Sequence, residues 1–217
     1  MPTREKIRGL YAICDNSFST QYSHVELAQE ILEGGCKILQ LRMKNESNLS
    51  KVRETTQQII HLKNKYDFIF ILNDYVELAA ALSVDGVHIG EDDLPIAVTR
   101  QIIGSDKIIG YSSHSLGEAM AAEKSGADYV ALGAIFPTKT KGPGHPVQGL
   151  AKLKEVLQNL KIPVVAIGGI TRKNIQTVLE TGASAVAMIT AISQAKNVTE
   201  STRYFVEQCQ KKQKQTK

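Results

Sequence analysis

The sequence has few of the residues that usually mark a nucleic-acid-binding protein. Aromatic residues make up 6% of the 217 positions, and tryptophan is absent. The net charge of +4 comes from the last seven residues, 211–217, which hold four lysines; the rest of the chain carries 22 basic and 22 acidic residues. A neutral body without a basic stripe argues against a nucleic-acid partner.

Cysteines and long apolar runs are also scarce. Cys14, Cys36 and Cys209 are odd in number and lack a metal-binding or redox spacing, so we expect buried free thiols in a reducing compartment and no disulfide. No apolar run approaches the roughly 20 residues of a membrane span. Residues 1–8 are polar and lack the apolar centre of a signal peptide. These absences predict a cytoplasmic protein with no membrane partner.

What the chain does contain is a repeated pattern in which a short apolar run precedes a segment of helical periodicity. Several runs are apolar without alternation, which is typical of parallel strands that are covered on both faces. Glycines follow the predicted helix ends at 34–35, 126 and 182, and hydroxyl caps stand at Ser115 and Thr171. The predicted strands are 9–14, 38–42, 68–73, 86–89, 107–112, 129–135, 163–167 and 185–189, and the predicted helices are 23–33, 48–65, 75–82, 95–103, 115–125, 148–159, 171–181 and 198–210.

Eight such units in 217 residues predict a single-domain (β/α)8 TIM barrel of the α/β class. We assign residues 1–210 to the barrel and residues 211–217 to a basic, disordered tail. The alternative is an open doubly wound sheet. That fold favours fewer strands and a glycine-rich turn after the first strand, which the sequence does not supply.

The segment after the sixth predicted strand concentrates groups that bind anions. Residues 136–146 include Thr138, Lys139, Thr140 and Lys141, followed by two glycines. Lysine supplies charge, threonine supplies short hydrogen-bond donors, and glycine lets the backbone approach an oxyanion. A solvated surface loop is the alternative. The position at a strand end favours a phosphate site, because barrel active sites gather at the carboxyl ends of the strands.

Every strand except the first is followed by polar residues or glycines of this kind. Gln40, Arg42 and Lys44 alternate with apolar residues, so they share one face, and the two cations suit a multiply charged anion such as diphosphate. Asn73 ends the third strand and Ser112 the fifth.

Two aspartates, Asp74 and Asp93, follow adjacent strands, so their carboxylates can converge. Two carboxylates with phosphate oxygens and water form a common Mg²⁺ arrangement. The alternative for Asp74 is the N-cap of the next helix. His88, inside the fourth strand, is more simply a packed core residue.

Gly168 and Gly169 leave the seventh strand, and Ile189 and Thr190 leave the eighth. In this fold the loops after strands 7 and 8 often bind phosphate through backbone N–H groups. Two glycines required only for a tight turn are the alternative.

The strand ends therefore divide into a half with cations and carboxylates and a half with glycines and hydroxyls. The first suits a diphosphate with Mg²⁺ and the second a monophosphate. A diphosphate bound to Mg²⁺ is an activated leaving group, so this pattern predicts transfer of a carbon group to a nucleophile on a second substrate. We find no nucleophile–base pair of the hydrolase kind and no histidine cluster for zinc.

At this point the residues match a known family: from about residue 10 to about residue 193, the chain resembles the thiamine-phosphate synthases (thiamine phosphate pyrophosphorylases). The motifs that carry the resemblance are QLRMK at 40–44, ILND at 71–74, VHIG at 87–90, DLP at 93–95, SSH at 112–114, GAIFPTKTK at 133–141 and IGGI at 167–170. The resemblance implies a (β/α)8 barrel and a transferase of thiamine biosynthesis. Such an enzyme joins hydroxymethylpyrimidine diphosphate to hydroxyethylthiazole phosphate, or to its carboxylated form, and releases pyrophosphate.

The resemblance also implies roles for individual residues. The pyrimidine diphosphate would be held by Gln40, Arg42, Lys44, Asn73, Ser112 and Lys141, and Mg²⁺ by Asp74 and Asp93. The thiazole phosphate would be held by Thr138, Lys139, Thr140, Gly168, Gly169, Ile189 and Thr190. Arg42, Ser112 and Lys141 would act in catalysis, and a homo-oligomer is compatible with the family.

Two departures from the family pattern are Glu91, where glutamine is usual, and Thr190, where serine is usual. Two other functions compete with this one. A related thiazole tautomerase would lack the two aspartates and the threonine–lysine run, and a non-catalytic phosphate-binding barrel would have lost the metal and diphosphate groups first.

Overall fold

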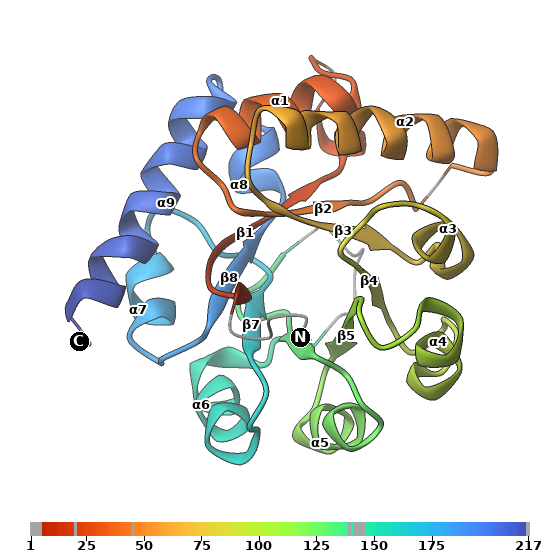
Figure 1. The fold of residues 1–217 in the computed structure, drawn as a ribbon. Coiled ribbons are helices and arrows are strands. Elements are labelled where there is room, and N and C mark those ends of the chain that lie inside the picture. Colours follow the sequence, from red (N-terminus) through yellow and green to blue (C-terminus); the bar gives the residue numbers. More distant parts are fainter. Residues whose placement is uncertain (1–5, 20, 45, 139, 141–145, 216–217) are drawn as a thin grey trace.

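The structure is a computed structural model that describes residues 6–19, 21–44, 46–138, 140 and 146–215. Eight parallel strands pair in chain order, and β1 pairs with β8, so the sheet closes into a barrel. Figure 1 shows the helices arranged around the outside of this barrel. The predicted single-domain (β/α)8 TIM barrel is therefore confirmed.

The strands differ from the predicted runs by at most three residues at either end. They are β1 (Gly9–Cys14), β2 (Ile38–Leu41), β3 (Ile69–Asn73), β4 (Gly86–Ile89), β5 (Ile108–Ser113), β6 (Tyr129–Leu132), β7 (Val164–Ile167) and β8 (Ala185–Met188).

The helices follow the predicted segments, with a few changes. They are η2 (Asn16–Phe18), α1 (His24–Glu33), α2 (Leu49–His61), η3 (Leu62–Asn64), α3 (Val76–Ala81), α4 (Ile96–Ile103), α5 (Leu116–Lys124), α6 (Gly149–Asn159), α7 (Ile175–Leu179), α8 (Thr190–Ser193) and α9 (Val198–Gln215).

Three of these boundaries correct the sequence predictions. Helix α7 begins at Ile175 rather than at Thr171, because the Asn174 carboxamide oxygen accepts from the Thr171 N–H at 2.7 Å and holds the intervening residues in a turn. The short helix α8 was not predicted. Helix α9 continues to Gln215, so most of the expected disordered tail is helical; residues 216 and 217 lie outside the described part.

The core has two layers. One lies between the barrel and its helices and includes the outward-facing side chains of every strand. The other fills the barrel interior with Tyr11, Ile13, Ile71, Tyr129 and their neighbours. Cys14, Cys36 and Cys209 are buried with free thiols. Among the described residues, no helix is long and apolar enough to cross a bilayer.

Candidate active site

Residues in or following all eight strands line one cavity of about 390 Å³ at the carboxyl end of the barrel. The structure brings together nine of the predicted site residues there: Gln40, Arg42, Lys44, Asn73, Asp74, Asp93, Ser112, Thr140 and Ile189. Glu91 and His114 also line it. This is the face on which (β/α)8 enzymes carry their active sites.

The cationic side of the cavity is held in place by a residue that the sequence analysis missed. Arg42 forms an ion pair with Asp15, whose side chain is 4% exposed and also accepts from the Ser17 N–H at 3.0 Å. Asp15 directly follows β1, the one strand after which no site residue was predicted, and it contacts Arg42 rather than lining this cavity. Its position at a strand end was the signal that could have identified it.

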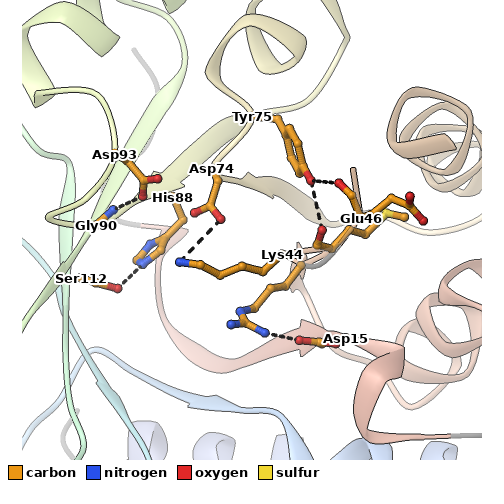
Figure 2. Close-up of polar contacts among 11 residues, drawn as sticks. Asp15, Lys44, Glu46, Asp74, Tyr75, His88, Gly90, Asp93 and Ser112 are labelled. Carbon is orange, nitrogen blue, oxygen red and sulfur yellow. Dashed lines mark hydrogen bonds and ion pairs between the residues drawn. The ribbon is translucent and has the colours of Figure 1, made fainter. Parts of the chain in front are cut away.

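Lys44 extends from the β2 end toward the carboxylates, and its Nζ lies 4.0 Å from Asp74 Oδ2 (Figure 2). The Lys44 side chain is 53% exposed. A contact at this distance and exposure stabilises the fold little. Lys44 is therefore available to bind an anionic ligand.

The two predicted metal ligands lie on neighbouring loops. Asp93 Oδ2 accepts from the Gly90 N–H at 2.7 Å, and Figure 2 shows the Asp74 side chain beside it. Burial and the negative charge of Asp93 raise the pKa of Asp74 to about 6, although Lys44 and Arg42 oppose that shift. Two carboxylates that repel each other in this way are suited to share a divalent cation.

The backbone of Asp74 also has a special conformation. Its φ is 68°, in the left-handed region that asparagine and aspartate tolerate better than other non-glycine residues. Tyr75, not Asp74, is the N-cap of α3, and no side chain caps that helix. The alternative reading of Asp74 as a helix cap is therefore wrong.

His88 is buried, as predicted, but it also lines the cavity and is hydrogen-bonded at both ring nitrogens. Its Nε2 lies 2.9 Å from Ser112 Oγ, and its Nδ1 lies 3.0 Å from the Tyr129 hydroxyl. This role was not predicted, because the periodicity of β4 distinguishes inward from outward residues but not packing from hydrogen bonding.

A second, smaller cavity of about 90 Å³ adjoins the first. It is lined by Thr138, Thr140, Gly168, Gly169, Ile189 and Thr190, which the sequence analysis assigned to the monophosphate. The two cavities have Thr140, Ile167 and Ile189 in common. Two ligands bound in them would therefore meet at this shared wall.

Both glycines of the second cavity have positive φ, 98° at Gly168 and 66° at Gly169. A Cβ at Gly168 would lie 2.6 Å from the Ala134 Cβ, and one at Gly169 would lie 2.6 Å from the Pro137 carbonyl oxygen. The turn after β7 thus packs directly against the chain that leaves β6. The glycines are required for this turn whether or not they also bind a ligand.

Thr138 and Thr140 are linked by a 3.0 Å contact between their hydroxyl oxygens, and Thr138 Oγ1 accepts from the Thr140 N–H at 3.3 Å. The predicted ligand-binding residues Lys139 and Lys141 lie outside the described residues, as do 142–145.

A closed parallel barrel carries, on one face, a cation-and-carboxylate cavity beside a glycine-and-hydroxyl cavity, and this arrangement is typical of (β/α)8 enzymes. Comparison with known proteins identifies the family. A model of the family described as "Thiamine monophosphate synthase" matches residues 10–192. The chain belongs to this family.

Individual relatives agree with this assignment. The chain is 43% identical over 189 residues to the thiamine-phosphate synthase of Shouchella clausii, which covers 87% of this chain and 90% of that protein. It is 41% identical over 211 residues to the thiamine-phosphate synthase of Pyrococcus furiosus, which covers 96% and 99%. A solved thiamine phosphate pyrophosphorylase from Pyrococcus furiosus superposes with a TM-score of 0.87 at 36% identity, over 96% of this chain and 98% of that one. The resemblance inferred from the motifs is thus confirmed.

Proposed function

We propose that this protein is a thiamine-phosphate synthase. It transfers the hydroxymethylpyrimidine group from its diphosphate to the ring nitrogen of hydroxyethylthiazole phosphate, or of its carboxylated form. The products are thiamine phosphate and pyrophosphate, and the carboxylated form also releases its carboxyl group as CO2. The observation that carries the proposal is the pair of adjoining cavities with different anion-binding groups and a shared wall at Thr140, Ile167 and Ile189.

The larger cavity suits the pyrimidine diphosphate. Arg42 and Lys44 supply positive charge, and Ser112 supplies a hydroxyl, beside the buried amides of Gln40 and Asn73. Arginine can bind two phosphate oxygens at once, and its pairing with Asp15 limits its freedom before the ligand arrives.

Asp74 and Asp93 are the residues that would hold Mg²⁺. The raised pKa of Asp74 fits this role, because a cation would relieve the repulsion from Asp93 that helps to raise it. No group of three or more histidine, cysteine, aspartate or glutamate ligands occurs among the described residues, which suits a metal completed by substrate oxygens and water. When bound, Mg²⁺ would neutralise charge on the departing pyrophosphate.

The smaller cavity suits the thiazole phosphate. The hydroxyls of Thr138, Thr140 and Thr190 and the backbone at Gly168 and Gly169 line it. A monophosphate there would direct the thiazole ring toward the shared wall, with its nitrogen facing the pyrimidine.

The chemistry needs no general base. The bond between the pyrimidine methylene carbon and the diphosphate oxygen breaks, and its electron pair leaves with pyrophosphate. The thiazole nitrogen then donates its lone pair to the cationic methylene carbon, which forms the new C–N bond without a proton transfer. Arg42, Ser112 and Lys141 are the residues that we expect to stabilise the negative charge on pyrophosphate.

The test is to mix the purified protein with both substrates and Mg²⁺ and to measure pyrophosphate release, omitting each component in turn. We expect release only when both substrates are present. Equal release without the thiazole phosphate would instead identify a diphosphatase. Conversion of the thiazole phosphate alone, without the diphosphate or Mg²⁺, would favour the tautomerase alternative.

A further inference from the structure

A chain of hydrogen bonds crosses the barrel interior beneath the larger cavity. Gln40 Nε2 donates to the Tyr11 hydroxyl at 2.9 Å, and that hydroxyl lies 2.6 Å from the Tyr129 hydroxyl. Tyr129 lies 3.0 Å from His88 Nδ1, and His88 Nε2 lies 2.9 Å from Ser112 Oγ. Its two ends, Gln40 and Ser112, line the cavity, whereas the two tyrosines are fully buried.

The register of the strands builds this chain. His88 pairs with Gly110, and Gly110 pairs with Tyr129, so the three residues form a row across β4, β5 and β6. A Cβ at Gly110 would lie 2.0 Å from Tyr129 Cζ and 2.2 Å from its hydroxyl oxygen. The missing side chain at Gly110 is therefore what lets the Tyr129 phenol reach His88.

The donors and acceptors determine one direction for the chain. The Gln40 amide nitrogen can only donate, so Tyr11 accepts there and gives its own proton to Tyr129, its other hydrogen-bond partner among the described residues. Tyr129 then donates to His88 Nδ1. Burial raises the pKa of both phenols, so both keep their protons at neutral pH.

His88, accepting at Nδ1, carries its proton on Nε2 and donates it to Ser112 Oγ. The Ser112 hydroxyl proton is then directed to a ligand. At the other end, the Gln40 nitrogen donates to Tyr11 and Gln40 lines the cavity, so we infer that its carbonyl oxygen is the atom that accepts from a ligand there.

We propose that Tyr11, Tyr129 and His88 are positioning residues that determine whether each end of this chain donates or accepts a hydrogen bond. As a result, Ser112 donates to an anion and Gln40 accepts from the bound ring. The identity of these ligands rests on the proposed function: the anion is the diphosphate, and the ring donor is an amino group of the pyrimidine. In a reversed chain Ser112 would donate its proton to His88, and only its lone pairs would face the phosphate oxygens, which they repel.

The direct test is the protonation site of His88, measured by ¹⁵N–¹H correlation spectra of the ¹⁵N-histidine-labelled protein at about pH 7.5. The signals are assigned by their loss in His88→Gln. We expect a neutral ring with the proton on Nε2 in the wild type. A proton on Nδ1, or a charged ring, would overturn the proposal. In Tyr129→Phe, which removes only the hydroxyl, we expect the His88 signals to move toward a mixture of the two neutral forms.

Kinetics test whether Tyr129 acts through Ser112. Tyr129→Phe should lower kcat/KM for the diphosphate substrate about tenfold, the effect of about one hydrogen bond, and leave KM for the thiazole phosphate within about twofold. In a Ser112→Ala background the same substitution should cost less than about twofold. An equal loss in both backgrounds would contradict the proposed coupling.

Tyr66→Phe is the matched control, because the Tyr66 hydroxyl donates to the exposed Glu33 at 2.6 Å and Tyr66 lines neither cavity. Its kinetics should equal those of the wild type. The spectra need no substrate, so a failure of the proposed function would appear in the pyrophosphate assay and not in the His88 protonation site.

Discussion

Asp74 combines an unfavourable backbone conformation with a partly buried charge at the candidate active site. Its φ of 68° is costly for most side chains, and its carboxylate lies partly buried near Asp93. Neither feature stabilises the metal-free fold. Both place a carboxylate where it can meet a cation and a diphosphate.

Asp74→Asn separates these effects, because asparagine also tolerates the left-handed conformation. We expect turnover to fall at least about 10²-fold, or about 2.7 kcal/mol of barrier, while the protein stays folded. The assay is pyrophosphate release with both substrates at saturation. Turnover close to that of the wild type would contradict the metal assignment.

The pKa of Asp74 also predicts a dependence on pH. Because its folded pKa of about 6 exceeds the unfolded value of 3.8, protonation favours the folded state, and this contribution is lost as pH rises through about 6. Without metal, Asp74→Asn should therefore become more stable than the wild type as pH rises from about 5 to about 8. Denaturant unfolding at both pH values measures this difference, and added Mg²⁺ should reduce or reverse it. A difference that does not change with pH would contradict the assigned pKa.

Asp15 is the second residue whose role depends on a charge. Asp15→Asn preserves its shape but removes the ion pair with Arg42, whose side chain is 22% exposed. We expect KM for the diphosphate to rise about tenfold and the free energy of unfolding to fall by about 1–3 kcal/mol, less than for a fully buried pair. Steady-state kinetics and denaturant unfolding measure the two effects.

The control for Asp15 is Glu33→Gln, which removes an exposed carboxylate 3.5 Å from Lys65. It should leave KM unchanged. An equal change in KM for both variants would show that the effect of Asp15→Asn does not come from its ion pair with Arg42.

At the scale of elements, the turn after β7 and the chain leaving β6 form one packed unit. The Ile135 N–H donates to the Ile167 carbonyl at 2.9 Å, and the Phe136 N–H donates to Gly168 at 3.0 Å. Through these bonds the strand ends position Thr138 and Thr140 against the small cavity. The site is thus made by contacts between loops rather than by either loop alone.

Gly168→Ala tests this contact, with Gly126→Ala as its matched control. The two glycines have φ of 98° and 96°, but a Cβ at Gly126 meets nothing within 4 Å. Both variants should lose about 1–2 kcal/mol from the positive φ, and Gly168→Ala about 1–3 kcal/mol more from crowding against Ala134. Only Gly168→Ala should raise KM for the thiazole phosphate. Equal stability losses in denaturant unfolding would contradict the crowding argument.

At the scale of the whole molecule, the C-terminal helix α9 covers the side of the barrel that contains the N-terminal strand β1. It packs against α1 and β1, and its Phe205 and Cys209 are buried. Figure 1 shows α9 running along the outside of the barrel past α1 and α7. The last helix thus packs over β1, the strand whose pairing with β8 closes the barrel.

Truncation after Gln210 should leave turnover within about twofold of the wild type, because the buried residues of α9 precede the cut. Truncation after Tyr204 is the comparison, since it removes Phe205 and Cys209 and should cost at least about 3 kcal/mol. Thermal unfolding and pyrophosphate release measure both truncations. Loss of activity on truncation after Gln210 would mean that the terminal lysines contact a substrate or a partner.

Much of this architecture could be predicted from the sequence, because the relevant signals are local. Apolar runs without alternation, glycines after helices and regular spacing predict eight strands and a barrel. A strand end is itself a local feature, so Gln40, Asp74 and Ser112 could be assigned to the cavity. The helix at Ile175 was misplaced, because the competing Asn174 turn depends on a side chain that also favours caps.

What the sequence alone determined is the class of fold, the family and the set of strand-end residues, since these follow from periodicity and motif. Only the tertiary structure decided which of those residues touch. Closure of the barrel joins Arg42 to Asp15 and brings the two cavities to a shared wall. It also lets Tyr11 meet Tyr129 across 118 positions of sequence. Such contacts depend on strand register and on the space left by Gly110, and no local pattern encodes either.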